Sequence, residues 1–455
     1  MNQYLNESNF LMLEEGFTTR DLLESLLGEL CQESEQQGFF MADLGDIVKK
    51  HLHFLKALPR VKPYFPVKCN SSEGVIRLLA ELGVGFACAN KAEFTRVQGI
   101  GVPPERIFYS SPCKQVAHLR HAAKHGVQLM TFDNEVELSK VARSHPRARL
   151  LLGITAASSA PPSMTFGTTL QSCRPLLEAA KERAVEVVGV SFHLGSRGLE
   201  PQAFAQAVAA AQLVFDVGTE LGHHMHLLDI GGGFPGTEDA RARFEEIAAV
   251  VNSALDLYFP DGSGVEIVAR PGRYYVTSAF TFAVSIAALE ELPVEQPGSD
   301  GRWDGGTGPP VCPSPPEPSP VTRGHPRPRG CSIFAPQRPC PEQPPRSSSL
   351  RGPAGLAEDR IADGLELPLL HVGDWLLFGN MGAYSIAASA TLGGCPQPRV
   401  TCAMSRMAWK AVQLFLGKPP QTEEERESLC TPLSCGWEMA ETLCVTPVFT
   451  PTSII

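Results

Sequence analysis

The sequence predicts an α/β protein: a closed (β/α)8, TIM-like barrel followed by a β-rich domain that is interrupted by a proline-rich insert. Between Val61 and Val276, eight short apolar runs alternate with helix-like stretches. The runs are nearly continuous in apolar residues, which is typical of parallel strands covered on both faces. Eight such units in roughly 220 residues favour a closed barrel over the alternative, an open doubly wound sheet. After Val276 the pattern changes, which indicates a second domain.

The eight predicted strands come, in chain order, from RVKPYFPVK, VGFACA, RIFYSS, QLMTFD, RLLLGIT, EVVGVSFHLG, HLLDIGGGF and VEIVAR. The stretches between them carry apolar residues at three- and four-residue spacing, as helices packed on one face do. We therefore assign residues 45–280 to the barrel. Residues 1–44 are too few for a core of their own, so we expect them to pack on the second domain.

Residues 281–297 and 347–455 are predicted to form the second domain, because SAFTFAVSIAALEELPVE and HVGDWLLFGNMGAY are rich in strand-forming residues. Residues 298–346, between them, are dense in proline. Proline lacks the backbone N–H that a ladder or a helix needs, so this insert is predicted to be disordered. In an alternative interpretation, the chain is an alternative product of its gene. The insert then stands in place of strands that the second domain would otherwise contain.

Composition narrows the classes of function. A formal net charge of −10 argues against a nucleic-acid surface, which needs clustered Lys and Arg. No apolar run approaches the roughly 18 residues of a membrane span, and the N-terminus lacks the zones of a signal peptide. The 13 cysteines form neither a repeating framework nor a metal knuckle, as in proteins of a reducing compartment. We expect a cytoplasmic protein, with perinuclear or vesicle-associated pools as the alternatives.

Several reactive residue types stand at predicted strand ends, where (β/α)8 barrels carry their active sites. They are Lys68 after the first strand, His193 and Ser196 after the sixth, Gly231, Gly232 and Gly233 after the seventh, and Arg270 and Arg273 after the eighth. Taken singly, each is also typical of a solvated side chain or a tight turn. Together they predict a pyridoxal-phosphate pocket, with an amine for the aldehyde, an imidazole against the ring and glycine N–H groups for the phosphate.

Long stretches of the chain resemble one family. They are FPVKCNSS, FACANKAEF, PCKQVAHLRHAAKHGVQLMTFDNEVEL, VSFHLGSRG, LDIGGGFPG, PGRYYVTSAF, HVGDWLLFGNMGAY and SCGWEMAETLCVTPVFTPTSII. The family is that of eukaryotic ornithine decarboxylase and its non-catalytic relatives, the antizyme inhibitors. The resemblance implies that Lys68 binds the aldehyde of pyridoxal phosphate and that His193 stacks on its ring. It also implies a phosphate site made by Ser196, Gly231, Gly232, Gly233, Arg273 and Tyr384.

Other positions depart from the family's pattern. The decarboxylases carry a glutamate before the PGR turn, where it accepts a hydrogen bond from the protonated pyridine nitrogen; Arg270 stands there instead. Arginine is always charged and cannot accept a hydrogen bond, so it opposes that protonation. Expected acidic, arginine, cysteine and aspartate residues are also replaced, by Ala87, Gly153, Gly355 and Leu356 respectively.

These departures predict a non-catalytic chain with no required cofactor and with weak or absent binding of pyridoxal phosphate. The alternative is an active ornithine-type decarboxylase that makes putrescine. Lys68, His193 and the glycine turn support that alternative, and Arg270 opposes it.

The resemblance also implies a partner. Antizymes capture ornithine decarboxylase, and an antizyme inhibitor removes them, which raises polyamine biosynthesis and uptake. The matching element runs from Lys114 to Lys140, and its candidate contact residues are Lys114, His118, Arg120, His121, Lys124, Asp133, Glu135 and Glu137. By charge pattern alone the same element could be an ordinary solvated face. We expect a monomer or a weak dimer.

Overall fold

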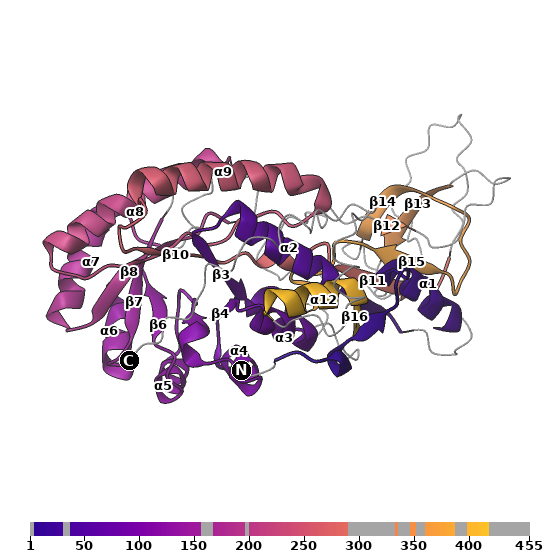
Figure 1. The fold of residues 1–455 in the computed structure, drawn as a ribbon, viewed down its shortest axis with the longest axis horizontal. Helices are drawn as coiled ribbons and strands as arrows, with labels where there is room; N and C mark the ends of the chain where they lie inside the picture. The colour runs from indigo at the N-terminus through magenta and orange to yellow at the C-terminus, as the bar shows by residue number, and fades with distance from the viewer. Residues whose placement is uncertain are drawn as a thin grey trace, which may run out of the picture.

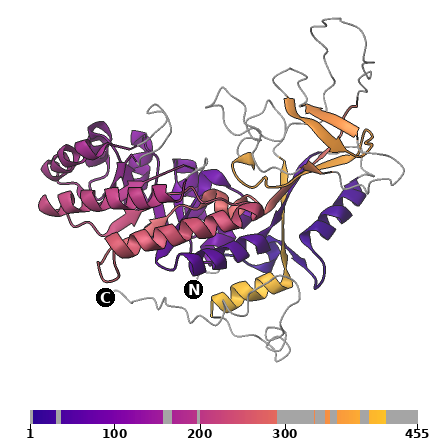
Figure 2. The ribbon, with the colours of Figure 1, turned by 90° about the horizontal axis from the view of Figure 1, so that it is seen from above.

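The structure is a computed structural model that describes residues 4–30, 37–155, 167–195, 200–289, 333–334, 346–351, 360–386 and 398–417. It contains a closed eight-stranded barrel and a separate six-stranded sheet. Figure 1 shows the barrel at one end of the molecule and the sheet at the other, and the two parts remain side by side in the view from above (Figure 2).

The barrel consists of eight parallel strands that correspond to the eight predicted ones. They are β3 (Val61–Pro66), β4 (Gly85–Cys88), β5 (Ile107–Tyr109), β6 (Leu129–Phe132), β7 (Arg149–Ile154), β8 (Glu186–Phe192), β9 (Leu227–Asp229) and β10 (Glu266–Ala269). The barrel closes where Ile267 of β10 pairs in parallel with Val61 of β3. The predicted fold class is therefore confirmed.

Helices cover the outside of the barrel. They are α2 (Leu44–Ala57), α3 (Glu73–Glu81), α4 (Lys91–Gly99), α5 (Val116–Lys124), α6 (Glu135–Ser144), α7 (Leu170–Glu182), α8 (Gln202–Glu220), α9 (Arg241–Tyr258) and the short α10 (Gly272–Val276). Two of them begin at asparagine caps, because the side chains of Asn90 and Asn134 accept hydrogen bonds from the N–H groups of Glu93 and Glu137. Such caps fix where each helix starts relative to the strand before it.

Side chains fill the interior of the barrel. Ala87, Phe108, Leu151, Val188, Leu227 and Val268 form one buried cluster with one residue from each of six strands. Tyr64 meets the ring of Phe108 edge to face at 6.4 Å between centroids. The barrel interior is thus a packed core, and in this fold an active site lies at the carboxyl ends of the strands.

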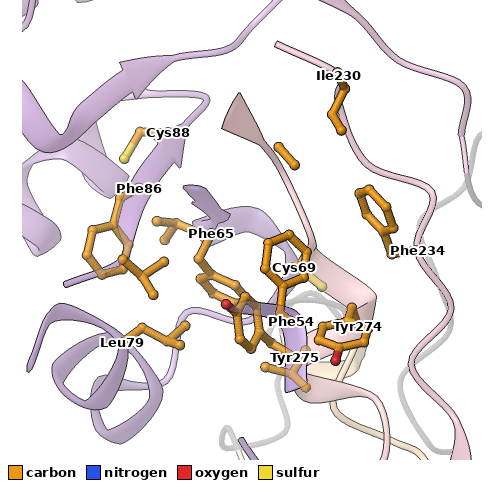
Figure 3. Packing of buried hydrophobic residues seen from close by; sticks show 14 of the residues in the cluster. Phe54, Phe65, Cys69, Leu79, Phe86, Cys88, Ile230, Phe234, Tyr274 and Tyr275 are labelled. Atoms are coloured by element: carbon orange, nitrogen blue, oxygen red, sulfur yellow. The ribbon is translucent and has the colours of Figure 1, made fainter. Parts of the chain in front are cut away.

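A second, larger core joins the barrel to the helices beside it. Figure 3 shows Phe54 of α2, Phe65 of β3 and Tyr274 and Tyr275 of α10 packed around Cys69. Phe54 meets Tyr274 edge to face at 5.7 Å, and Phe65 meets Tyr275 at 6.3 Å. Because Cys69 is buried in this cluster, the turn that carries its neighbour Lys68 is held against the barrel.

The sheet has the order β1-β16-β2-β11-β15-β12. Its strands are β1 (Leu11–Leu13), β2 (Phe39–Asp43), β11 (Phe280–Ser285), β12 (Ile333–Phe334), β15 (Trp375–Phe378) and β16 (Arg399–Ser405); β13 (Arg346–Arg351) and β14 (Arg360–Leu367) form a separate pair. Alternate residues of β2 face opposite sides, as the pleat requires. Phe39 and Met41 pack under α1 (Thr19–Leu30). Phe40 lies in the larger core instead, with 4.5 Å between the centroids of its ring and the ring of Phe282. Both faces of the sheet are therefore covered.

The structure differs from the sequence-based expectations in three places. The strand β12 lies inside the segment predicted to be disordered; Ile333 and Phe334 belong to the proline-free run 329–335 and pair with β15. The region predicted to be β-rich also contains a helix, α12 (Arg406–Phe415), which packs against α2. The N-terminal segment contacts the barrel as well as the sheet, because Glu81 of α3 accepts a hydrogen bond from the Tyr4 N–H at 2.6 Å.

Candidate functional site

The carboxyl ends of the barrel strands form a mouth that gathers most of the predicted pocket residues. Lys68 lies in the 3-10 turn Val67–Cys69 directly after β3, and His193 follows β8. The three glycines follow β9, and Arg270 follows β10. The mouth thus joins residues that are far apart in the chain. Ser196, like Gly355 and Leu356, lies outside the described residues.

Arg270 makes an ion pair with a carboxylate that the sequence alone did not reveal, Asp229 at the end of β9. The Arg270 Nε atom lies 3.0 Å from Asp229 Oδ2, and the Asp229 side chain is 0% exposed. Ser191 donates its hydroxyl to the same carboxylate at 2.7 Å, and the Gly231 N–H donates at 2.9 Å. In the sequence, the one sign that Asp229 belongs to the mouth is its position at the end of the apolar run HLLD.

His193 is held in one tautomer. The Gly232 N–H donates a hydrogen bond to His193 Nδ1 at 3.0 Å, so the lone pair is on Nδ1 and the ring proton is on Nε2. His193 reaches solvent at the mouth, but the protein around its ring displaces part of its hydration. This loss of hydration, together with the positive charges of Arg270 and Lys68, lowers the pKa of His193. A neutral imidazole at the mouth follows from both observations.

The glycine turn, predicted to hold a phosphate, has partners within the protein. The Gly231 N–H is bonded to Asp229, and the Gly232 N–H is bonded to His193. A Cβ atom on Gly231 would lie 2.2 Å from the Phe192 carbonyl oxygen, and the residue has φ +69°. Glycine is therefore required at this turn for packing alone.

Lys68 lies between charges of opposite sign. The Lys68 side chain reaches solvent but loses part of its hydration within the mouth. This loss of hydration, followed by the positive charge of Arg270, lowers the pKa of Lys68. The negative charge of Glu93 raises that pKa and partly offsets the change. The Glu93 carboxylate caps its own helix by accepting the Ala89 N–H at 2.7 Å. Burial raises the pKa of Glu93, and the charge of Lys68 partly offsets that change. Lys68 thus keeps an amine beside a carboxylate at the position that the resemblance assigns to the aldehyde.

Arg273 and Tyr384 lie against each other beside the mouth, although they belong to α10 and to the chain that follows β15. The Arg273 guanidinium lies over the Tyr384 ring at 4.9 Å, and the Tyr384 N–H donates to the Cys69 carbonyl at 2.7 Å. Tyr384 has φ +67°, a left-handed conformation that a bulky residue adopts only when its surroundings enforce it. A cation and a phenol at this position are suited to a phosphate group.

The mouth fits one end of pyridoxal phosphate and not the other. Lys68, Arg273 and Tyr384 present the amine and the anion-binding groups that the resemblance requires. The position for the ring-nitrogen partner holds Arg270, whose guanidinium is tied to Asp229 and lies 5.6 Å from the Phe108 ring centre. A guanidinium can donate only, so it offers no acceptor to a protonated ring nitrogen.

Two residues of the predicted partner element are buried and do not lie on the surface where contact residues were expected. The Lys114 side chain is 0% exposed and that of Glu137 is 3% exposed, with 3.6 Å between Lys114 Nζ and Glu137 Oε2. Lys114 Nζ also donates to the Thr131 carbonyl, and Lys140 forms an ion pair with Glu137. These residues tie the start of α5 to β6 and α6. The charge pattern of the sequence could not reveal that their side chains turn inward.

The other predicted contact residues reach the surface to different degrees. Arg120 and Lys124 on α5 and Glu135 on α6 are exposed, while His118, His121 and Asp133 are partly buried. Glu135 is paired with Arg183, which follows α7. The His121 ring lies 4.2 Å from the ring of His125, and burial followed by the surrounding positive charges lowers the pKa of His121. The outer face of α5 is therefore basic.

The described part of the chain offers no candidate for a membrane-spanning helix or for a metal site. Within it, no helix combines the length and the apolar character needed to cross a bilayer. The same described residues contain no group of three or more His, Cys, Asp or Glu side chains arranged to hold a metal ion.

Known proteins share this architecture and much of this sequence. The family model described as "Pyridoxal-dependent decarboxylase, pyridoxal binding domain" matches residues 44–277. The chain is 53% identical over 470 residues to antizyme inhibitor 2 of Xenopus laevis, covering 100% of both. It is 48% identical to ornithine decarboxylase of Mus pahari over 94% of each chain.

Solved structures agree with the sequence comparison. The crystal structure of the arginine decarboxylase of Paramecium bursaria Chlorella virus, bound to agmatine, has a TM-score of 0.72 at 25% identity, covering 85% of this chain and 100% of that one. The predicted resemblance to ornithine decarboxylase and the antizyme inhibitors is confirmed, with the similarity to proteins named antizyme inhibitor 2 extending over the full chain.

Proposed function

The chain belongs to the pyridoxal-dependent decarboxylase family that includes ornithine decarboxylase and the antizyme inhibitors, and from this premise we propose that it is a non-catalytic member that binds antizyme. By withdrawing antizyme from ornithine decarboxylase it would relieve inhibition of that enzyme and raise polyamine biosynthesis and uptake. The similarity to proteins named antizyme inhibitor 2, over the full length of both chains, carries this proposal. We propose the cytoplasm as its compartment and a monomer or weak dimer as its state.

The mouth of the barrel supports the non-catalytic assignment. Decarboxylation on pyridoxal phosphate uses the ring as the electron sink, and a protonated ring nitrogen makes that sink effective. Here the residue before the PGR turn is Arg270, and the nearby Asp229 carboxylate is already neutralised by it. Placing a second positive charge at this point would be unfavourable. No cofactor is required for the proposed role.

The proposed contact surface is the outer face of α5, with its basic side chains Arg120 and Lys124 exposed. An acidic surface on the partner is the chemistry that this face would recognise. Lys114 and Glu137 act beneath the surface by joining α5 to α6. Because the joint is buried and paired, we infer that the face is held in one conformation before the partner arrives.

A pull-down with purified antizyme tests the proposal. We expect the wild-type chain to retain antizyme and the Arg120→Glu/Lys124→Glu variant to retain roughly tenfold less, since each reversal places like charges against an acidic partner. The matched control is Arg20→Glu/Lys56→Glu, which makes the same change of charge at exposed positions outside the element. A folded wild-type chain that retains no antizyme would refute the proposal.

A decarboxylation assay separates the proposed role from the alternative. With ornithine and added pyridoxal phosphate, we expect no release of carbon dioxide above the background without protein. Release that depends on Lys68, and is lost in Lys68→Ala, would establish the decarboxylase alternative instead.

A further inference from the structure

We propose that Arg270 is the internal counter-ion of Asp229, so that the barrel is complete without a cofactor and the Arg270 guanidinium holds the place of a ring-nitrogen partner in its mouth. This pairing stabilises the barrel whichever partner the outer surface binds.

Asp229 needs a cation because of where it lies. Its side chain is 0% exposed, and it ends β9 inside the closed barrel. The hydrogen bonds from Ser191 and from the Gly231 N–H are both made by neutral groups. A buried carboxylate that receives only neutral donors carries a large desolvation cost, which a paired guanidinium offsets.

Arg270 is positioned to be that cation. Its side chain is 14% exposed, and its Nε atom lies 3.0 and 3.2 Å from the two oxygens of Asp229. Its Nη2 atom lies 3.4 Å from Ser191 Oγ, so the guanidinium reaches two strands at once. The backbone fixes where the side chain starts, because the Arg270 N–H donates to the Gly231 carbonyl at 2.6 Å. Turning the guanidinium toward solvent would leave Asp229 unpaired.

The glycine turn completes the same unit. A Cβ atom on Gly232 would lie 2.8 Å from the Arg270 carbonyl oxygen and 3.1 Å from His193 Cε1, so the turn packs directly on both residues. A protonated heterocycle that entered this mouth would have to share Asp229 with Arg270 and would meet the charge of Lys68. The protein's own groups therefore satisfy one another without a ligand.

A double-mutant cycle on thermal stability tests the pairing. Arg270→Met keeps the length of the side chain and removes the charge, while Asp229→Asn keeps the shape and an acceptor oxygen. We expect each single variant to lower the melting temperature by roughly 6–12 °C and the double variant to lower it by clearly less than the sum. The surface pair Arg174–Glu220, with side chains 48% and 63% exposed, is the matched control, where the same cycle should give little change. Additive losses at Arg270 and Asp229 would overturn the proposal.

A titration with pyridoxal phosphate supplies an independent readout. We expect pyridoxal phosphate to raise the melting temperature of the wild-type chain no more than inorganic phosphate at the same concentration does, because Arg270 holds the place of a ring-nitrogen partner. A saturating rise beyond that given by inorganic phosphate would show that the ring enters despite Arg270, and would overturn the proposal. Antizyme retention is scored separately, on the wild-type chain, so the proposed function and this inference fail by different measurements.

Discussion

Replacing Lys114 with methionine removes a buried charge from beneath the proposed partner surface. The Lys114 amine donates to the Thr131 carbonyl and lies 3.6 Å from Glu137 Oε2, and methionine keeps the length of the side chain but makes neither contact. Breaking a buried ion pair costs about 3–5 kcal/mol. Because Glu137 retains Lys140 and the backbone N–H of residue 114, we expect a loss at the lower end, about 3 kcal/mol.

Lys124→Met is the matched control, since it makes the same chemical change at an exposed position of α5. A surface substitution of this kind changes the free energy of unfolding by about 0.5 kcal/mol or less. The two variants should therefore behave in opposite ways. Lys114→Met loses stability and keeps its affinity for antizyme while folded, whereas Lys124→Met keeps stability and binds antizyme more weakly.

Urea denaturation followed by intrinsic fluorescence measures the first property, with the midpoint compared at an unchanged slope. Antizyme pull-down without denaturant, at a temperature where both variants are folded, measures the second. A Lys114→Met variant that is as stable as the wild type and yet fails to bind antizyme would refute the buried, structural role. That result would mean that the Lys114 side chain reaches the partner.

Two further predictions concern buried charge and pH. Burial lowers the pKa of Lys114 to about 8 from its ordinary value of 10.5. Between these two pH values the unfolded chain binds more protons than the folded chain, so the free energy of unfolding rises with pH. The rise is at most about 1.4 kcal/mol per pH unit. Between pH 8 and 10.5, the urea midpoint of the wild type should therefore rise relative to that of Lys114→Met. Midpoints of the two proteins that change with pH in the same way would contradict the lowered pKa of Lys114. Arg270→Glu should restore no decarboxylation, because it leaves Ala87 and Gly153 in place of the acidic residue and the arginine of the decarboxylases. It also sets a second carboxylate beside the buried Asp229 and raises the pKa of one of the two acids. Relative to the wild type, the melting temperature of this variant should increase as the pH falls below neutrality, when that acid is protonated. Ornithine turnover by the variant would contradict this prediction.

The barrel could be predicted from the sequence because its signals are local. Each strand is a short apolar run, each helix has its own spacing, and the repeat of the two is what a closed parallel sheet requires. The helix α12 was missed because aromatic and apolar residues such as Trp409 and Val412 fit a strand as well as a helix face. The strand β12 was missed because the prolines around it dominate the local composition.

The candidate site was predicted less completely than the fold. Lys68, His193, the glycine turn and Arg270 were identified because strand ends of a barrel meet at one mouth. Asp229 was not, because a carboxylate in an apolar run gives no sign of its partner, which follows 41 positions later. Lys114 and Glu137 were named as contact residues because they lie in the element that the resemblance matches to the partner, and charged side chains are usually exposed.

The amino-acid sequence by itself determined the order of strands and helices, the positions of the strand ends and the resemblance to a decarboxylase family, since each depends on residues close together in the chain. Only the tertiary structure decided which charges are buried and which partners they have. It turned Lys114 and Glu137 inward between α5 and α6, left Arg120 and Lys124 outside, and set Arg270 against Asp229. The physical reason is that the cost of a charge depends on its exposure to water and its nearest opposite charge, and both arise from contacts between distant segments.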